Sequence, residues 1–245
     1  MKTSNTLLFS IALSALALAS TSCGKDHWPN CIKANKKNAT ETRSLENFTE
    51  IQLDGSGDVY LYQLTDSSLP TVEIETSENV MDRVTTEVKG NKLVLSTECI
   101  RGTYDLTYTI RVADLSKVKI SGSGNVTTMT PFNLNDVNLE IDGSGNMDFE
   151  TDATNVACHI SGSGNIELDG TCDDLDLEID GSGDIHAFDM PTTDCFINIS
   201  GSGNCEVYVN GILNVTVSGS GDVIYDGTPT EFSTNSSGSG TVRKR

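Results

Sequence analysis

A five-residue unit recurs through this chain and constrains its fold more than any other feature of the sequence. The unit has a Gly-Ser-Gly centre flanked by Asp, Ser, Asn or Thr, and it occurs eight times. Successive first glycines are 67, 21, 19, 19, 20, 18 and 19 residues apart. A steady period of about 20 residues predicts stacked structural repeats. The glycines expected to form the corners of these repeats are Gly55, Gly57, Gly122, Gly124, Gly143, Gly145, Gly162, Gly164, Gly181, Gly183, Gly201, Gly203, Gly219, Gly221, Gly238 and Gly240.

The residues around each unit alternate between apolar and polar. Val137, Leu139 and Ile141 precede one unit, and Met147 and Phe149 follow it in the same phase. A period of two predicts strands that enter and leave a tight corner. Glycine is expected at the corner because adjacent backbones come too close for a Cβ atom, and because glycine adopts conformations closed to other residues.

Twenty residues suffice for two short strands and two turns, but they leave no room for a helix. We therefore predict an all-β fold, a right-handed parallel β-helix of about 20-residue coils that forms a two-sheet rod with Gly-Ser-Gly corners. Outward Ser, Asn and Asp side chains are expected to stack in hydrogen-bonded ladders. The regular repeats span residues 121–245, and an N-terminal β block spans 47–120.

The N-terminal block lacks the motif between residues 58 and 120. Strand-like stretches lie at 59–64, 71–75, 92–96 and 104–112, and residues 89–92 fit a hairpin turn. These strands are compatible with about three coils that lack the motif, or with a separate meander.

The first 22 residues are typical of a signal peptide, because an apolar run of about 13 residues is too short to span a bilayer. Cleavage after Ala19 would leave a soluble protein, whereas Ser20-Thr21-Ser22-Cys23 resembles a bacterial lipobox in which Cys23 is lipidated. We prefer lipidation, although Ser20 stands where lipoboxes usually carry Leu. Residues 23–46 are polar and aperiodic, so we predict a flexible tether between an outer-membrane or cell-surface lipid anchor and the rod.

The repeated Asp/Ser-Gly-Ser-Gly-Asn/Asp unit, the strand-rich block and the lipoprotein leader together resemble the auto-transporter adhesin head domain (GIN domain) family of Bacteroidetes. The resemblance covers residues from about 47 to 242. It implies a two-sheet β-helical rod with Gly-Ser-Gly at the turn between the sheets, a role in cell adhesion, and no established catalytic residues.

The charge of the chain excludes several functions. Its formal net charge is -19, and no Lys or Arg occurs between Lys119 and Arg243. Binding of nucleic acid or of another anionic polymer is therefore excluded for the regular half. A uronate lyase would need basic residues there. A hydrolase needs only two carboxylates, so a carbohydrate-active enzyme stays as an alternative, but we predict that the protein is not an enzyme.

Two columns of titratable residues are candidates for metal binding. Five positions after the first glycine, Glu167, His186 and Glu206 follow one another on successive coils. They could hold a divalent cation, but a solvated charged ladder in which the imidazole relieves acid repulsion accounts for them without metal. A similar column contains His159. Calcium is the only cofactor that we consider, and the motif matches calcium-binding β-rolls poorly because Asn replaces Asp in half the copies.

Aromatic residues and cysteines suggest further contacts. Phe188 and Tyr208 fall seven positions after the first glycine of successive coils, where they could grip a sugar or a second subunit, or else cover a turn. The six cysteines after Cys23 are interpreted as buried thiols at positions 158, 195 and 205 and as residues outside the core columns at positions 31, 99 and 172. We assign no disulfide.

These observations favour a surface-exposed lipoprotein that acts as a non-enzymatic cell-adhesion or ligand-binding module for a glycan or a protein. The alternative is a structural or regulatory envelope lipoprotein that faces the periplasm. A homo-oligomer would suit an adhesive rod.

Overall fold

The computed structural model describes residues 31–245. The predicted signal peptide (1–22), the lipidation residue Cys23 and the start of the predicted tether lie outside the described residues. Among residues 31–245, no helix has the length and hydropathy needed to cross a membrane.

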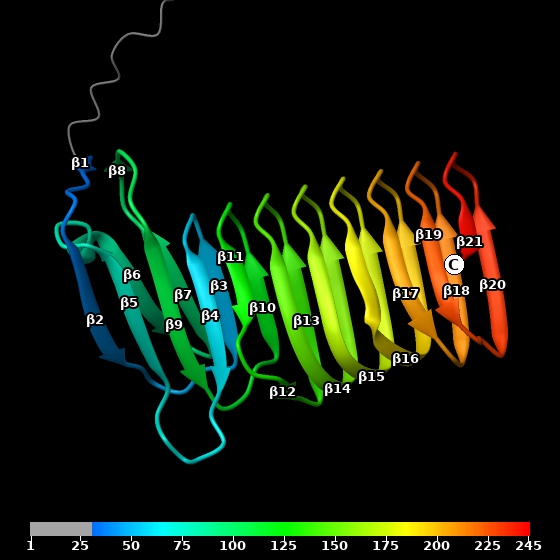
Figure 1. Ribbon diagram of the computed structural model, residues 1–245, viewed down its shortest axis with the longest axis horizontal. Coiled ribbons are helices and arrows are strands. Elements are labelled where there is room, and N and C mark those ends of the chain that lie inside the picture. The colour runs from blue at the N-terminus through cyan, green and yellow to red at the C-terminus, as the bar shows by residue number, and fades with distance from the viewer. Residues whose placement is uncertain (1–30) are drawn as a thin grey trace, which may run out of the picture. The chain divides into compact units, whose positions relative to one another are not determined.

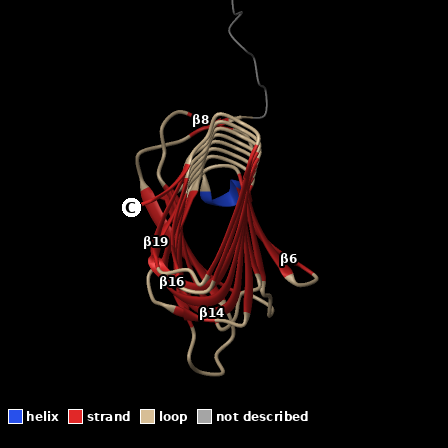
Figure 2. Ribbon diagram, turned by 90° about the vertical axis from the view of Figure 1, so that its right-hand side faces the viewer, coloured by secondary structure: helices blue, strands red, loops and turns tan. Residues whose placement is uncertain are grey.

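The described residues form a two-sheet rod of stacked parallel coils (Figure 1). In each regular coil, a strand of the first sheet leads into the Gly-Ser-Gly turn, and a strand of the second sheet leads out of it. Seen along the stack, the turns superpose at one edge of the rod (Figure 2). The regular strands are β10 (Lys117–Ile120), β11 (Asn125–Thr128), β12 (Phe132–Asn133), β13 (Asp136–Ile141), β14 (Met147–Ile160), β15 (Ile166–Ile179), β16 (Ile185–Ile199), β17 (Cys205–Val209), β18 (Ile212–Val217), β19 (Val223–Gly227), β20 (Glu231–Ser236) and β21 (Val242–Lys244). The predicted parallel stack of two sheets is confirmed.

The edge of the rod opposite the Gly-Ser-Gly turns differs from the prediction of two turns per coil. Strands β14, β15 and β16 each run for 14 or 15 residues from the second sheet, around this edge, and into the first sheet. They pair in parallel along nearly their whole length. The second corner is therefore a bend within a continuous strand.

The apolar half of the alternating pattern forms the core between the sheets. Val137, Leu139 and Ile141 are at most 3% exposed, as are Met147 and Phe149 on the other side of the turn. Each lies in register with an apolar residue of the next coil. Burial of these side chains is the main favourable contribution to folding of the rod.

Glycine is required at the turns because the coils stack directly on one another there. A Cβ atom on Gly164 would lie 1.7 Å from the carbonyl oxygen of Gly145, and one on Gly143 would lie 1.9 Å from that of Gly122. The predicted close approach of backbones is therefore confirmed. The second predicted reason, that glycine adopts conformations closed to other residues, holds only in the first turn. Of the sixteen turn glycines, only Gly55 (φ 128°) and Gly57 (φ 129°) have a positive φ.

Polar ladders flank the turns, as predicted. The side-chain oxygen of Asn146 accepts a hydrogen bond from the backbone N–H of Asn165, and that of Asn165 accepts one from Asp184 in the next coil. On the other flank, the Ser161 hydroxyl donates to Asp142 of the preceding coil. The asparagine side chains satisfy backbone donors that the tight turn would leave without a strand partner.

The N-terminal block is a mixture of one further coil and antiparallel strands. Its elements are β1 (Ile32–Lys33), β2 (Asn38–Ser44), β3 (Glu50–Asp54), β4 (Asp58–Gln63), β5 (Thr71–Ser77), the short 3₁₀ helix η1 (Met81–Arg83), β6 (Val84–Lys89), β7 (Lys92–Thr97), β8 (Ile100–Arg101) and β9 (Leu106–Val112). Strands β7 and β9 continue the two sheets in parallel beyond β3 and β4, without a Gly-Ser-Gly turn. Strands β6, β5 and β2 then add in antiparallel directions. The block is thus neither three coils nor a separate meander.

The predicted tether was wrong for residues 31–46. Strand β2 pairs with β5 over seven residues, Asn38 to Ser44, and β1 pairs with β8. Polar composition concealed these strands because β2 is an edge strand with mostly exposed side chains. Such a strand needs few apolar residues.

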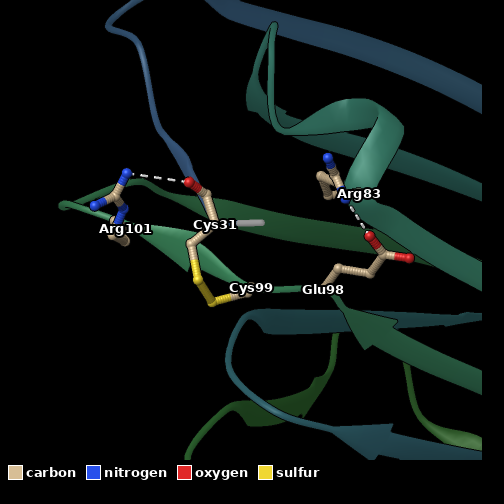
Figure 3. The surroundings of a disulfide bond; sticks show 5 residues. All are labelled: Cys31, Arg83, Glu98, Cys99 and Arg101. Carbon is tan, nitrogen blue, oxygen red and sulfur yellow. Dashed lines mark hydrogen bonds and ion pairs between the residues drawn. A yellow bond between two sulfur atoms is a disulfide. The ribbon is translucent and has the colours of Figure 1, made fainter. Parts of the chain in front are cut away.

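A disulfide joins Cys31 to Cys99, two residues that we left unpaired (Figure 3). The Arg101 guanidinium donates a hydrogen bond to the Cys31 carbonyl, and Arg83 forms an ion pair with Glu98 beside the bridge. The disulfide closes a segment of 68 residues that contains β1 to β7. The start of the described chain is therefore covalently attached to the end of the rod.

Candidate functional site

A hollow lies on the outer face of the second sheet. It measures about 650 Å³ and extends over the first five Gly-Ser-Gly coils. Its lining residues are Asp58, Tyr60, Asn125, Val126, Thr127, Asn146, Met147, Asp148, Asn165, Glu167 and His186. A smaller hollow of about 220 Å³ adjoins it, shares Glu167 and His186, and reaches the sixth coil at Glu206. We refer to the two hollows together as the second-sheet groove.

The position of the groove follows from the repeat. Residues three positions after the first glycine form the Asn/Asp ladder, which starts where the Asn125 amide donates to Asp58. Residues five positions after it point outward from the second sheet. The register places Tyr60, Thr127 and Asp148 side by side on consecutive coils. The same column continues through Glu167, His186 and Glu206. Polar side chains therefore line the groove on each of six coils.

Four side chains of this column have polar atoms that are not engaged elsewhere. Within residues 31–245, the side chains of Tyr60, Thr127, Asp148 and Glu167 make no hydrogen bond or ion pair with the protein. The ladder asparagines, by contrast, are occupied by the backbone of the next coil. The unengaged groups are those free to contact a ligand.

The fold brings the predicted metal column together, and a hydrogen bond joins two of its members. Nδ1 of His186 lies 3.0 Å from Oε2 of Glu206, and Glu167 is the register neighbour of His186 on the other side. No group of three or more His, Cys, Asp or Glu side chains in the described part of the chain has an arrangement that could hold a metal ion. The geometry corresponds to the charged ladder that we considered as the alternative.

The predicted aromatic column was wrong. A register shift between Ala187 and Pro191 inserts extra residues into β16, so Tyr208 pairs with Pro191. Phe188 lines the smaller hollow, and the Arg245 guanidinium lies 4.7 Å from the centroid of the Phe188 ring. Sequence alignment on the glycines could not reveal this bulge, because the extra residues lie seven or more positions after the first glycine of their turn.

Acidic side chains dominate the electrostatics of the second sheet. No Lys or Arg lines either hollow of the groove. Partial burial, together with the neighbouring carboxylates of Asp189 and Asp148, raises the pKa of Asp169 above its ordinary value. A shift in this direction is the expected response of a carboxyl group to like charges.

The first sheet carries compensated charges instead. Lys117 and Lys119 both form ion pairs with Glu140, and Lys119 also pairs with Asp142. The hydrogen bond from Lys119 lowers the pKa of Asp142. His159 lies 3.3 Å from Asp180. Members of the second column considered for metal binding thus take part in ion pairs and hydrogen bonds with neighbouring side chains.

The free cysteines have no features of a reactive site. Cys158, Cys195 and Cys205 are buried in the core, as predicted. Cys172, which we placed outside the core columns, is also buried at 5% exposure. Burial raises the pKa of the Cys158 and Cys195 thiols far above the ordinary value. Thiols of this kind are poor nucleophiles.

Comparison with known protein families identifies the fold and its relatives. The family model described as "Putative auto-transporter adhesin, head GIN domain" matches residues 47–229. The chain belongs to this family. Membership in this family is consistent with an adhesion or binding module of the cell surface or envelope, which is the coarse function that the sequence predicted.

Several solved structures of similar proteins come from Bacteroides and Parabacteroides. A "putative adhesin" from Bacteroides fragilis has the same fold, with a TM-score of 0.83, 24% identity, and 87% of this chain and 99% of that chain covered. A "putative lipid binding protein" from Parabacteroides distasonis has a TM-score of 0.72 and 26% identity, with 87% and 98% covered. A second protein from that organism, a "putative adhesin", has a TM-score of 0.73 and 25% identity, with 88% and 100% covered. No similar protein is found among curated proteins.

Sequence reasoning missed Tyr60 and Thr127 as members of the groove. The 67-residue interval hides them, because it suggests that the first unit belongs to a different part of the fold. Alignment on Gly55 would have placed Tyr60 in the column of Thr127, since both residues lie five positions after the first glycine of their unit.

Proposed function

We propose that this member of the GIN-domain family is a lipid-anchored, surface-exposed lipoprotein of the outer membrane that binds a glycan or protein ligand without catalysis. The lipobox-like sequence ending at Cys23 supports the anchor. The family match supports adhesion. The observation that carries the proposal is the second-sheet groove, in which the outward side chains of four successive coils are not engaged within the described protein.

The absence of catalysis has its own support. Asp148 and Glu167, the unengaged carboxylates of the groove, lie side by side on one flat sheet. Hydrolysis of a glycosidic bond needs two carboxylates that flank the bond from opposite sides. A ligand lying on this face would meet both carboxylates from the same side. We therefore expect neither turnover of polysaccharides nor a requirement for a cofactor, calcium included.

Binding by cells that carry the full-length protein tests the proposal. Fluorescent matrix proteins and glycans should adhere to these cells, and Asp148→Asn with Glu167→Gln should reduce adhesion. The matched control is Asp176→Asn with Glu178→Gln, which removes the same charges from the exposed face of the first sheet. Equal adhesion by both variants and the wild type would contradict a role for the groove.

Orientation and anchoring are tested on the same cells. Protease added outside intact cells should degrade the protein, and Cys23→Ala should release it from the membrane fraction. Protection from protease would instead support the periplasm-facing alternative. Light scattering of the detergent-extracted protein, with calcium and after chelation, tests the expectation of a homo-oligomer and the absence of a calcium effect.

A further inference from the structure

We propose that the ligand of the second-sheet groove is a linear polysaccharide without acidic groups, which lies along the axis of the stacked coils. This inference rests on the proposed function and adds the class of ligand. Its basis is the combination of the groove's direction, its charge, and the chemistry of its unengaged side chains.

The direction of the groove favours a linear, repeating ligand. The column from Tyr60 to Glu206 contributes one outward side chain from each of six consecutive coils. Adjacent coils are about 4.8 Å apart, so these side chains extend over roughly 24 Å. A polymer with a short repeat contacts an equivalent position on each coil, whereas a compact molecule would use only a part of the groove.

The charge of the groove excludes acidic polymers. Asp58, Asp148 and Glu167 line it, and neither hollow has a Lys or Arg in its lining. The imidazole of His186 is paired with Glu206. Along the larger hollow, a uronate or sulfated chain would place its negative charges against these carboxylates with no Lys or Arg in the lining, and this repulsion opposes binding.

The side chains match the hydroxyl groups of sugars. Carboxylates accept hydrogen bonds, and the Thr127 hydroxyl and Tyr60 phenol both donate and accept. Hydrogen bonds to charged acceptors are the stronger kind. Tyr60 lies in the first coil. Its ring adds partly apolar surface at that end of the groove, where the C–H face of a sugar ring can pack.

A peptide ligand is disfavoured by two observations. The strands of the second sheet from β4 to β19 are paired on both sides, so none offers a free edge to an added strand. The aliphatic residues in the lining, Val126, Met147 and Leu168, are at most 1% exposed. The groove therefore lacks the apolar pockets that anchor peptide side chains.

Binding of defined oligosaccharides to the full-length, detergent-extracted protein tests this inference. The probes are the six-sugar oligomers of cellulose, mannan, xylan and chitin, with hexagalacturonate as the acidic counterpart. At least one neutral hexamer should bind, its dimer should bind at least tenfold more weakly, and hexagalacturonate should not bind. Asp148→Asn with Glu167→Gln should weaken binding of that hexamer at least tenfold, and Asp176→Asn with Glu178→Gln should leave it unchanged.

Several outcomes would overturn the inference. Preferred binding of hexagalacturonate would contradict the charge argument, and an equal loss in both double variants would remove the groove from recognition. If no neutral hexamer binds while cells carrying the protein still adhere to matrix proteins, the ligand class is wrong but the proposed function stands. If neither glycans nor matrix proteins bind, both fail. Circular dichroism of each variant distinguishes lost binding from lost folding.

Discussion

At the scale of single residues, the glycines of the turns show how little space separates neighbouring coils. Fourteen of the sixteen have no positive φ, so their conformation alone does not require glycine. What excludes other residues is the backbone of the adjacent coil, as at Gly164 and Gly145. One Cβ atom at such a site would push two coils apart, and every turn in the stack depends on the position of the turn before it.

Substitution of Gly164 by Ala should therefore destabilise the protein strongly. Its Cβ atom would lie 1.7 Å from the Gly145 oxygen. Overpacking of this severity costs roughly 3 kcal/mol. Thermal unfolding should shift down by roughly 6 to 12 °C. The control is Ser163→Ala in the same turn. The Ser163 hydroxyl is exposed, so its removal should change the melting temperature little. Similar melting temperatures for the two variants would contradict the packing argument.

Asp169 gives the second prediction at this scale. Burial and the carboxylates of Asp189 and Asp148 raise its pKa in the folded state above the ordinary value of 3.8. The folded state then holds the proton more tightly than the unfolded state does. Stability from this group is present below the unfolded pKa and is lost as pH rises through the folded pKa.

Asp169→Asn should consequently stabilise the protein at pH 7. Because Asp169 is only partly buried, we expect a small increase in melting temperature, roughly 1 to 2 °C. The gain should shrink as the pH is lowered through the folded-state pKa of Asp169, because the wild-type carboxyl group then takes up a proton. Melting curves at several pH values measure this, and a gain that grows with acidity would show that the sign is wrong.

At the scale of elements, the N-terminal strands explain how a parallel stack ends. Strands β6 and β2 run antiparallel to their neighbours β7 and β5, so the pattern of parallel coils stops at this end of the rod. Strand β2 is held by one neighbour and by the disulfide that precedes it. The covalent bond compensates for the small apolar contribution of an edge strand whose side chains are mostly exposed.

Removal of the disulfide should lower the stability of the whole described unit. Closure of a 68-residue loop in the unfolded chain is worth about 4 kcal/mol in the chain-entropy model. Cys99→Ser should reduce the free energy of unfolding in urea by up to this amount. Dithiothreitol should lower the stability of the wild type to that of the variant and leave the variant itself unchanged. No response of the wild type to reductant would mean that the bond does not form.

At the scale of the whole molecule, the two ends of the rod differ. The last coil continues both sheets, but two of its core positions in β20 are polar. Thr234 and Ser236 lie in register with Val215 and Val217, and all six residues of β20 are exposed. Polar terminal repeats of this kind keep stacked proteins soluble. The three basic residues at 243–245 also charge this end of the rod, which opposes stacking of one rod on another.

The last coil should therefore prevent end-to-end association. Thr234→Val with Ser236→Val extends the apolar core to the exposed edge, and we expect this variant to form dimers or larger species at micromolar concentration. Ser233→Val with Asn235→Val adds the same apolar groups to the outward side of β20 and serves as the control. Light scattering measures the masses. A mass equal to that of the wild type would contradict a capping role for the last coil.

The sequence by itself determined the stacked β architecture, the Gly-Ser-Gly corners and the outward column that contains Glu167, His186 and Glu206. These features are local and periodic. Strand alternation and a fixed repeat place residues of equal offset on adjacent coils, so the register follows from counting. The exclusion of acidic ligands also follows from counting charges.

Only the tertiary structure decided the features that depend on contacts between distant or irregular segments. The pairing of Cys31 with Cys99 joins residues far apart in the chain, and β2 has no apolar pattern that marks it as a strand. The bulge after Ala187 breaks the count that placed Phe188 beside Tyr208. Tyr60 enters the groove because β4 pairs with β11 across a 67-residue interval. The periodic pattern ends where the chain has an insertion, an antiparallel strand or a disulfide. At those places tertiary packing alone determines which residues are in contact.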